Sequence, residues 1–451
     1  MKKYYQHILL GLVLCIAMPL AAQEGFYKGV DLSYVNEMED CGAVYKENGV
    51  AKDPYQIFAD HGANLVRIRL WHTPDWTNYS NLKDVKKSIR RAREKGMQVL
   101  LDFHYSDTWA DPEKQHIPAA WENVETVEVL GQKVYDYTYE TLMALDQEGL
   151  MPELVQIGNE TNGNIMVKEG EELYPVDFDR MVFLMKEGIK ATKEAGAKSS
   201  IQPKTVIHVA GPKDVKWWFS EAVSKGLTNF DIIGISYYPK WHSEYNIQQL
   251  GEVIDHLKAT YSKDVMIVET GHPWTEEGVE ESAGNVMNES APGYDAPSPK
   301  VQRQYMIDLT TEVYQRGGLG VIYWEPAWVS TPCQTLWGTG SHWENITFFD
   351  FEGALLSTGG IQFLSVDYSK DLVLYSDLME VLQNDSIYPN PASNYIYLKG
   401  EKNSVSWEVH DLNGKCVLKA ENMDRLDISS LQEGIYILSV NQQQQFRLLK
   451  N

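Results

Sequence analysis

Eight short apolar runs, each long enough for one β-strand, recur between residues 26 and 325. Longer stretches with apolar residues at helical spacing separate most of these runs. Two of the stretches, residues 82–95 and 177–195, end near Gly96 and Gly196, which are suited to terminate a helix. The pattern therefore predicts strands that alternate with helices. The predicted strands cover residues 26–33, 64–71, 97–104, 153–160, 204–210, 231–238, 265–270 and 319–325.

This alternation predicts an α/β protein with a (β/α)8 TIM barrel, which a helix near residues 370–383 would close. A doubly wound open sheet is the alternative arrangement of the same elements. It is disfavoured because no Gly-x-Gly-x-x-Gly turn follows an early strand. With 451 residues, 43% of them hydrophobic, the chain is long enough for a large core and a second, smaller domain.

The pattern changes after residue 384, where short alternating runs replace the long helical stretches. Turn signals such as Asn413-Gly414 separate some of these runs. We therefore expect the barrel domain to cover residues 23–384 and a small all-β sandwich to cover residues 385–451. The predicted strands of the sandwich are residues 395–398, 405–409, 416–418 and 435–440.

The N-terminus has the three parts of a secretory signal peptide. Two lysines form a basic start, residues 8–20 an apolar stretch, and Ala21-Ala22 the small residues of a cleavage site. The apolar stretch is too short for a typical membrane span, and no later segment reaches that length. We therefore expect residues 1–22 to act as a signal peptide and the protein to be secreted or held at the cell surface.

The net charge of −23 argues against nucleic acid or an anionic membrane as a partner. It equally argues against polyanionic polysaccharides, so a neutral polymer is the favoured ligand class. The chain contains 13 tryptophans and 26 tyrosines. These rings suit a surface that stacks on sugars, and a well-filled core is the alternative use for each of them.

Two of the strands end in a glutamate, Glu160 after residues 153–159 and Glu269 after four consecutive apolar residues. The C-terminal ends of barrel strands converge on one mouth, where such enzymes carry their chemistry. A single glutamate at a strand end is usually a solvated or helix-capping carboxylate. Two of them at one mouth are the equipment for glycoside hydrolysis, one as acid/base and one as nucleophile.

Arg67 and Arg69 alternate with Ile68 on the second predicted strand, so both side chains point to the same face. If that face is the barrel lumen, an arginine there would hold a nearby carboxylate ionised. Tyr237, at the end of the sixth strand, is positioned to donate a hydrogen bond to the same carboxylate.

Three cysteines remain after the predicted signal peptide. Cys41 follows the first strand and Cys333 the eighth, and these strands are neighbours in a closed barrel. An oxidising compartment would preserve a disulfide between them. Two free buried thiols are the alternative, because sequence does not define loop geometry. Cys416 is expected to stay unpaired.

Motifs at the strand ends carry a resemblance to a known family. They are NLVRIRLWH (64–72), VLLDFHYSDTWADP (99–112), VQIGNETN (155–162), IGISYYPKWH (233–242), IVETGHPWT (267–275) and YWEPAW (323–328). Together they resemble the endo-β-1,4-galactanases of glycoside hydrolase family 53, within a larger clan of (β/α)8 retaining glycosidases. A departure is Gly271-His272, where the family pattern leads us to expect a small residue followed by tyrosine.

The resemblance implies an enzyme that hydrolyses β-1,4-galactosidic bonds in galactan or type I arabinogalactan by double displacement, without a cofactor for the chemistry. It implies Glu160 as acid/base and Glu269 as nucleophile, with carboxyl groups about 5–5.5 Å apart. We expect Arg69 and Tyr237 to keep Glu269 ionised. Glu160 is expected to hold its proton because burial and the nearby Glu269 raise its pKa.

By the same resemblance, Arg69, Asn159, Tyr237 and Trp324 line the subsite where the bond is cleaved. Five tryptophans just beyond strand ends are expected to stack on galactosyl rings, and three polar residues to bind hydroxyl groups. Core packing is the alternative for Trp324, which is nearest its strand. The tryptophans are Trp109, Trp241, Trp274, Trp324 and Trp328, and the polar residues are His104, Asp107 and His242.

The segment 275–285 is acidic and contains glycine. Bacterial members of the resembled family often bind a structural calcium ion between the loops after strands seven and eight, and oxygen ligands suit that ion. The resemblance therefore implies a calcium ion near Glu276, Glu277 and Asn285. A solvated acidic loop is the alternative.

The C-terminal segment has its own resemblance. YPNPAS (388–393), VHDLNGK (409–415) and GIYI (434–437) resemble the type A sorting domain of the type IX secretion system. This implies that the type IX machinery is a partner. A carbohydrate-binding module is the alternative, but it needs several solvent-facing aromatic residues, and this segment offers only Trp407 and scattered tyrosines.

Three hypotheses for function remain. The favoured one is a galactanase, and the second is a mannanase, xylanase or glucanase of the same clan with the same mechanism. The third is a non-catalytic glycan-binding protein, against which the intact Glu160 and Glu269 pair argues.

Overall fold

The computed structural model describes residues 25–278, 284–369, 387–398, 405–411, 415–423, 425–440 and 444–450. The predicted signal peptide and the predicted closing helix near residues 370–383 lie outside the described residues. None of the helices within these ranges is long and apolar enough to cross a membrane.

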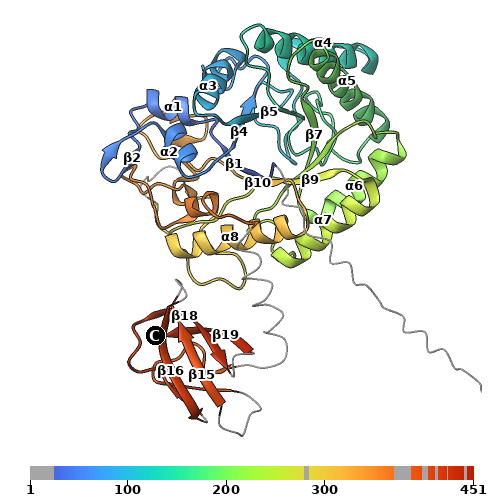
Figure 1. The fold of residues 1–451 in the computed structure, drawn as a ribbon. Coiled ribbons are helices and arrows are strands. Elements are labelled where there is room, and N and C mark those ends of the chain that lie inside the picture. Colours follow the sequence, from blue (N-terminus) through green and yellow to red (C-terminus); the bar gives the residue numbers. More distant parts are fainter. Residues whose placement is uncertain are drawn as a thin grey trace, which may run out of the picture.

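Eight parallel strands form a closed barrel in which the last strand pairs with the first (Figure 1). All eight predicted strands are present, so the predicted TIM barrel is confirmed and the open doubly wound sheet is excluded. The strands are β1 (Tyr27–Asp31), β4 (Leu65–Leu70), β5 (Gln98–Phe103), β6 (Leu154–Ile157), β7 (Lys204–Ala210), β8 (Ile232–Ser236), β9 (Asp264–Glu269) and β10 (Gly320–Tyr323).

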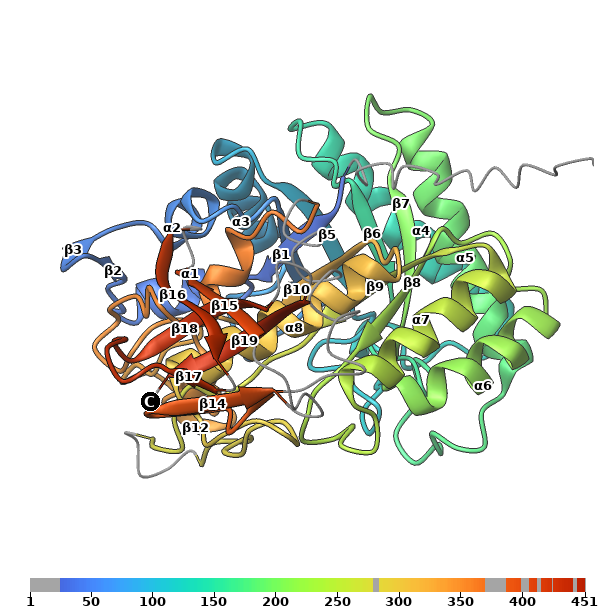
Figure 2. The same cartoon turned by 60° about the horizontal axis from the view of Figure 1, so that its bottom comes forward.

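Helices surround this barrel, and Figure 2 shows α6, α7 and α8 side by side along one flank. Polar side chains cap several of them: Asn81 accepts hydrogen bonds from backbone N–H groups of α3, and Asn246 forms a capping box with Gln249 on α7. The helices are α1 (Val35–Asp40), α2 (Pro54–Asp60), α3 (Leu82–Glu94), α4 (Val127–Asp146), α5 (Phe178–Gly196), α6 (Pro212–Ser224), α7 (Ile247–Tyr261) and α8 (Pro299–Gln315).

The barrel lumen changes from apolar to polar along its axis. An apolar cluster that includes Leu65, Leu100 and Ile232 fills one layer. Along β4, side chains alternate between the two faces of the strand, so Arg67 and Arg69 point inward with Leu65. Both arginines are buried, at 1% and 2% exposure. The predicted arginine pair therefore lies inside the barrel, and its charges need partners there.

A disulfide ties together the loops at the mouth near β1 and β10. Cys41, at the end of α1, forms a disulfide with Cys333 across 292 residues of sequence. A short hairpin of β11 (Gln334–Thr335) and β12 (Gly338–Thr339) follows directly. The disulfide is the first of the two outcomes that the cysteine positions allowed. Cys416 is free and exposed, as expected.

The C-terminal strands form two antiparallel sheets with one shared core (drawn in red in Figure 1). One sheet has the order β13-β14-β17 and the other β16-β15-β18-β19. Trp407, in the middle of the core, is fully buried. The strands are β13 (Ile387–Tyr388), β14 (Tyr395–Leu398), β15 (Val405–His410), β16 (Cys416–Met423), β17 (Arg425–Asp427), β18 (Gly434–Val440) and β19 (Gln444–Lys450).

Candidate active site

A cleft of about 640 Å³ opens at the C-terminal ends of the barrel strands, and Glu160 and Glu269 both lie in its wall. One carboxylate oxygen of each glutamate and one ring nitrogen of His208 all lie within 4.8 Å of one another. Retaining glycosidases hold their two carboxyl groups about 5–5.5 Å apart, whereas inverting enzymes leave about 6.5–9.5 Å for a water molecule. The short separation suits direct attack by one of the carboxylates.

Glu269 ends β9 and is 5% exposed. Its Oε1 lies 2.8 Å from Nη2 of Arg67, and its Oε2 accepts a hydrogen bond of 3.0 Å from the hydroxyl of Tyr238. Burial raises the pKa of the Glu269 carboxyl to about 7, and the Arg67 guanidinium opposes this shift. Both contacts favour the ionised form, which is the form that a nucleophile requires.

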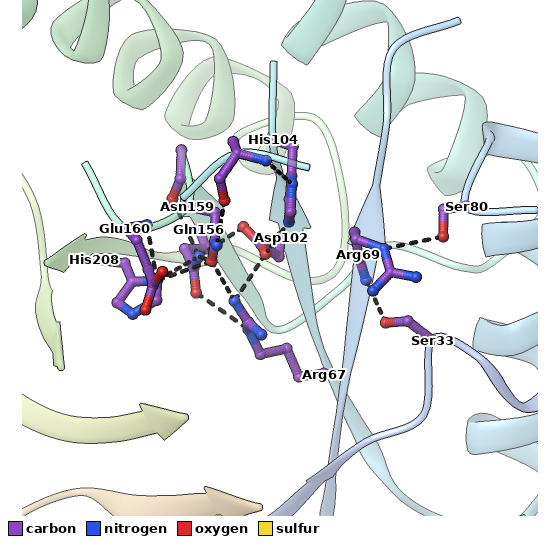
Figure 3. A network of polar contacts seen from close by, with 12 residues as sticks. Ser33, Arg67, Arg69, Ser80, Asp102, His104, Gln156, Asn159, Glu160 and His208 are labelled. Carbon is purple, nitrogen blue, oxygen red and sulfur yellow. Dashed lines mark hydrogen bonds and ion pairs between the residues drawn. The ribbon is translucent and has the colours of Figure 1, made fainter. Parts of the chain in front are cut away.

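Arg67 connects four strands across the lumen (Figure 3). Its Nη1 donates to Asp31 at 2.8 Å, and its Nη2 donates to Asp102 at 2.8 Å and to Oδ1 of Asn159 at 2.6 Å. Burial disfavours its charge, but the carboxylates of Asp102, Glu269 and Asp31 raise the pKa of Arg67 above its ordinary value. The guanidinium therefore stays charged.

Glu160 lies just beyond β6 in a left-handed backbone conformation, with φ of 43°. This region is sparsely populated by residues other than glycine, and such strain is common at functional sites. The strained backbone turns the Glu160 N–H toward Nδ1 of His208, which accepts it at 3.2 Å. Because Nδ1 is an acceptor, the proton of neutral His208 is on Nε2 and is donated to Ser236 Oγ at 2.8 Å.

Ser236 in turn donates its hydroxyl proton to Oε1 of Glu160 at 2.6 Å. This chain of hydrogen bonds fixes one oxygen of the carboxyl group. Burial, and then the negative charge of Glu269, raise the pKa of Glu160 well above its ordinary value. Burial also lowers the pKa of His208 well below its ordinary value, so the ring stays neutral. The raised pKa favours the protonated form of Glu160, which is the form that a general acid needs.

The predicted role of Arg69 beside Glu269 was wrong. Figure 3 shows Arg69 away from Glu160, and its Nη1 lies 3.4 Å from Oε1 of Glu325, with the guanidinium 4.2 Å from the ring centroid of Trp109. It also stacks on Tyr34 and Trp71. Because both arginines point inward, the alternation along β4 did not show which one reaches the nucleophile.

The predicted contact from Tyr237 to Glu269 was also wrong, and the neighbouring residue makes it. The Tyr237 hydroxyl donates to the backbone oxygen of Tyr245 at 2.7 Å. Side chains alternate along an extended chain, so the residue that shares the lumen face with Ser236 is Tyr238. That alternation was the signal in the sequence that identifies Tyr238.

The aromatic wall of the cleft differs in part from the prediction. Four of the five predicted tryptophans line it, together with Asn159 and His242. Trp274 does not; its ring packs 4.9 Å from that of Phe351, and its N–H donates to the backbone oxygen of Glu344. Trp337 and Trp343 line the cleft and were not predicted, because they lie well beyond β10. The four predicted tryptophans in the wall are Trp109, Trp241, Trp324 and Trp328.

Comparison with known proteins agrees with this geometry. Residues 27–362 match the profile of "Glycosyl hydrolase family 53". The chain belongs to glycosyl hydrolase family 53. Residues 386–450 match a "Secretion system C-terminal sorting domain".

Relatives of this family 53 chain come from several organisms. It is 50% identical over 345 residues to an arabinogalactan endo-β-1,4-galactanase of Cellvibrio japonicus, covering 76% of this chain and 91% of that protein. It is 35% identical to an endo-β-1,4-galactanase of Bacillus subtilis, covering 70% and 76% of the two chains. Among solved structures, the family 53 catalytic domain of Ignisphaera aggregans is similar, with a TM-score of 0.69 and 30% identity over 77% of this chain and 98% of that one.

Two residues of this family 53 site that were predicted to bind sugar hydroxyls are held by the protein instead. Nε2 of His104 lies 3.0 Å from Oδ2 of Asp102, and Nδ1 of His104 accepts a hydrogen bond from the backbone N–H of Ala110. Asp107 accepts hydrogen bonds from the backbone N–H groups of Thr73 and Ala119. Neither lines the cleft. Both hold the loop after β5 in position, and the strand-end motifs alone did not distinguish this use from sugar binding.

The departure at Gly271-His272 has a structural explanation. A side chain at Gly271 would place its Cβ 2.6 Å from Cζ2 of Trp343, so the glycine leaves room for that indole. His272 is fully buried, with its ring 4.7 Å from that of Tyr305. Trp343, in the segment after β10, therefore supplies an aromatic ring beside Glu269.

Tyr238 and Tyr237 provide a matched test of the hydrogen bond to Glu269. In Tyr238→Phe, ionised Glu269 loses a hydrogen bond, so its pKa rises and activity is lost at a higher pH as the solution is acidified. We expect the acidic limb of the kcat/KM profile to move up by about one pH unit, because one hydrogen bond to a charged group shifts its pKa by about that much. Tyr237→Phe is the control and leaves the limb in place. Equal shifts in both variants would contradict the assignment.

Proposed function

We propose that this protein is a retaining endo-β-1,4-galactanase that cleaves galactan or type I arabinogalactan, with Glu160 as acid/base and Glu269 as nucleophile. The observation that carries the proposal is the pair of carboxyl groups at the barrel mouth, with one oxygen of each within 4.8 Å of the other and with Glu269 bonded to Arg67; the raised pKa of Glu160 supports it. The 50% identity to an arabinogalactan endo-β-1,4-galactanase supports the choice of substrate.

In the first step, a Glu269 oxygen attacks the anomeric carbon while Glu160 gives its proton to the glycosidic oxygen. The bond to the leaving chain breaks, and a glycosyl ester forms on Glu269. The ester carries no negative charge, so one cause of the raised pKa of Glu160 disappears. Glu160 is then ready to take a proton from the water that attacks the ester, which releases the sugar with its original configuration.

The protein's own side chains supply what this reaction needs, and no cofactor takes part. Arg67 and Tyr238 hold Glu269 in the ionised form and fix both of its oxygens. Asn159 donates one amide hydrogen to the backbone oxygen of Ala110 and lies in the cleft beside Glu160. The tryptophans of the wall provide flat apolar faces for galactosyl rings.

The C-terminal domain supports export and not sugar binding. Its one tryptophan, Trp407, is fully buried and donates its N–H to the backbone oxygen of Met423, so it offers no ring to a sugar. We propose that residues 386–450 direct the enzyme through a type IX secretion system to the cell surface or the medium, after export by the predicted signal peptide.

We also propose a structural calcium ion between the loops after β9 and β10. Asn285 Oδ1 and Asn345 Oδ1 are buried without a hydrogen-bond partner among the described residues. The Glu344 carboxylate lies beside the same loop, 3.0 Å from the position of a Cβ at Gly278. These three side chains fit a hard cation, which Asn285, Glu344 and Asn345 would hold. Glu276 and Glu277 are exposed.

Substrate specificity is tested with purified polysaccharides. We expect the enzyme to release reducing sugar from β-1,4-galactan at least about 100-fold faster than from mannan, xylan or β-glucan, and product NMR to show retention at the anomeric carbon. Glu160→Gln and Glu269→Gln should each lose at least about 1000-fold in kcat on galactan. A preference for another polymer supports the alternative specificity, while binding without hydrolysis supports a glycan-binding protein.

The calcium ion is tested by thermal unfolding. A ligand that binds the folded state stabilises it, so removal of calcium with a chelator should lower the Tm by several degrees and added calcium should restore it. Glu344→Gln weakens the site and should make the Tm less sensitive to calcium. A wild-type Tm that is unchanged by the chelator would rule out a stabilising calcium ion.

A further inference from the structure

A second cavity of about 470 Å³ lies beside the catalytic cleft, between the loops that follow β5 and β6. Its volume falls in the usual range for ligand sites, about 300–1,000 Å³. The cleft and this cavity share Pro112 and Glu113 in their walls. We call it the β5–β6 cavity; these two residues form a wall that it has in common with the cleft.

The β5–β6 cavity reaches the backbone of the acid/base. Gln115 forms part of its wall and is 3% exposed. Gln115 Nε2 donates to the backbone oxygens of Asn159 at 2.8 Å and Glu160 at 3.2 Å. The wall of the cavity and the strained turn that presents Glu160 are therefore one hydrogen-bonded unit.

Two exposed aromatic side chains of the barrel line the β5–β6 cavity or the cleft. In the described part of the barrel, three large aromatic side chains are about half exposed: Tyr174 at 51%, Trp217 at 48% and Trp241 at 50%. They belong to the segments that follow β6, β7 and β8. Tyr174 lines the β5–β6 cavity, and Trp241 lines the cleft. Exposed aromatic rings beside a cavity are typical of a binding surface.

The loop that carries Tyr174 is held in one shape. Asn164 Nδ2 donates to the backbone oxygens of Glu172 and Pro175, each at 3.1 Å. Gly163 lies under the tyrosine ring, since a Cβ there would be 3.3 Å from Tyr174 Cζ. The ring is therefore presented to solvent by a fixed support, which lowers the entropy cost of binding.

We propose that the β5–β6 cavity binds the sugar units of the leaving chain, with Tyr174 stacked on a galactosyl ring; this rests on the proposed function. A general acid must contact the oxygen of the leaving group, so the leaving chain extends from the cleavage point on the side of Glu160. Gln115, in the wall of the β5–β6 cavity, donates to the backbone oxygen of Glu160, so the cavity adjoins the turn that carries the acid. Its carboxylates, among them Glu113, Glu169 and Glu172, accept hydrogen bonds from neutral sugar hydroxyls.

The proposal separates two halves of the substrate path. We assign the tryptophans of the cleft that follow β10, which are Trp324, Trp328, Trp337 and Trp343, to the part of the chain that stays on the enzyme. The β5–β6 cavity acts only when the leaving group is a chain of sugars. A substrate with a small synthetic leaving group does not reach it.

The test compares two substrates for the Tyr174→Ala variant. On galactohexaose or long galactan, loss of one stacking contact should lower kcat/KM about tenfold. On 2,4-dinitrophenyl β-galactotetraoside, which keeps the sugars of the retained chain and has a single aryl ring as its leaving group, kcat/KM should change less than twofold. Tyr174→Phe keeps the stacking ring and should restore activity on galactohexaose. Tyr395→Ala removes an exposed tyrosine of the C-terminal domain and is the matched control.

Two results would overturn the proposal: an equal loss on both substrates, or no loss on galactohexaose. The first points to damage at the reacting centre, and the second to a cavity that contacts no sugar. A wild-type enzyme that cleaves neither substrate contradicts the proposed function itself, so the two failures are distinguishable.

Discussion

The site depends on a single buried arginine that is shared by more carboxyl groups than it can neutralise. Arg67 contacts Asp31, Asp102 and Glu269 at 2.8 Å each. Removing an ion from water is costly, and only close, well-hydrogen-bonded partners repay that cost. Arg67 therefore fixes where β1, β5 and β9 present their carboxylates. The apolar layer below it and the mouth above it meet at this guanidinium.

The excess of carboxyl groups also decides where protons are held. Glu325 is buried and Glu160 is partly buried near these groups, and the pKa of each is raised well above its ordinary value. For Glu160 the second cause is the charge of Glu269, and for Glu325 it is the charge of Asp31. Glu269 differs because Arg67 and Tyr238 hold it. These different surroundings support the opposite roles proposed for two chemically identical side chains, one as acid and one as nucleophile.

The barrel and the two glutamates could be predicted from the sequence, because hydrophobic periodicity and position at a strand end are local properties of the chain. Eight apolar runs with helices between them specify a barrel, and strand ends specify its mouth, so Glu160 and Glu269 were found together. The sequence did not show which of Arg67 and Arg69 contacts Glu269. Both side chains point inward, and they differ only in where their guanidinium groups lie in the folded protein. The alternation of side chains that starts at Ser236 places Tyr238 on the lumen face, but the prediction named its neighbour, Tyr237. Trp337 and Trp343 reach the cleft from a long loop, whose path no periodic pattern describes.

The most direct test of this account is the rate at which Glu269 is glycosylated when acid catalysis is not needed. Rapid mixing with 2,4-dinitrophenyl β-galactobioside measures this step, because dinitrophenolate leaves without a proton. Arg67→Lys replaces the planar guanidinium, which has several N–H donors in fixed directions, with one ammonium group. We predict a loss of at least about 100-fold, and at least tenfold more than in Arg69→Lys, which reports the cost of changing a buried arginine as such. A rate in folded Arg67→Lys within threefold of the wild type would contradict the account.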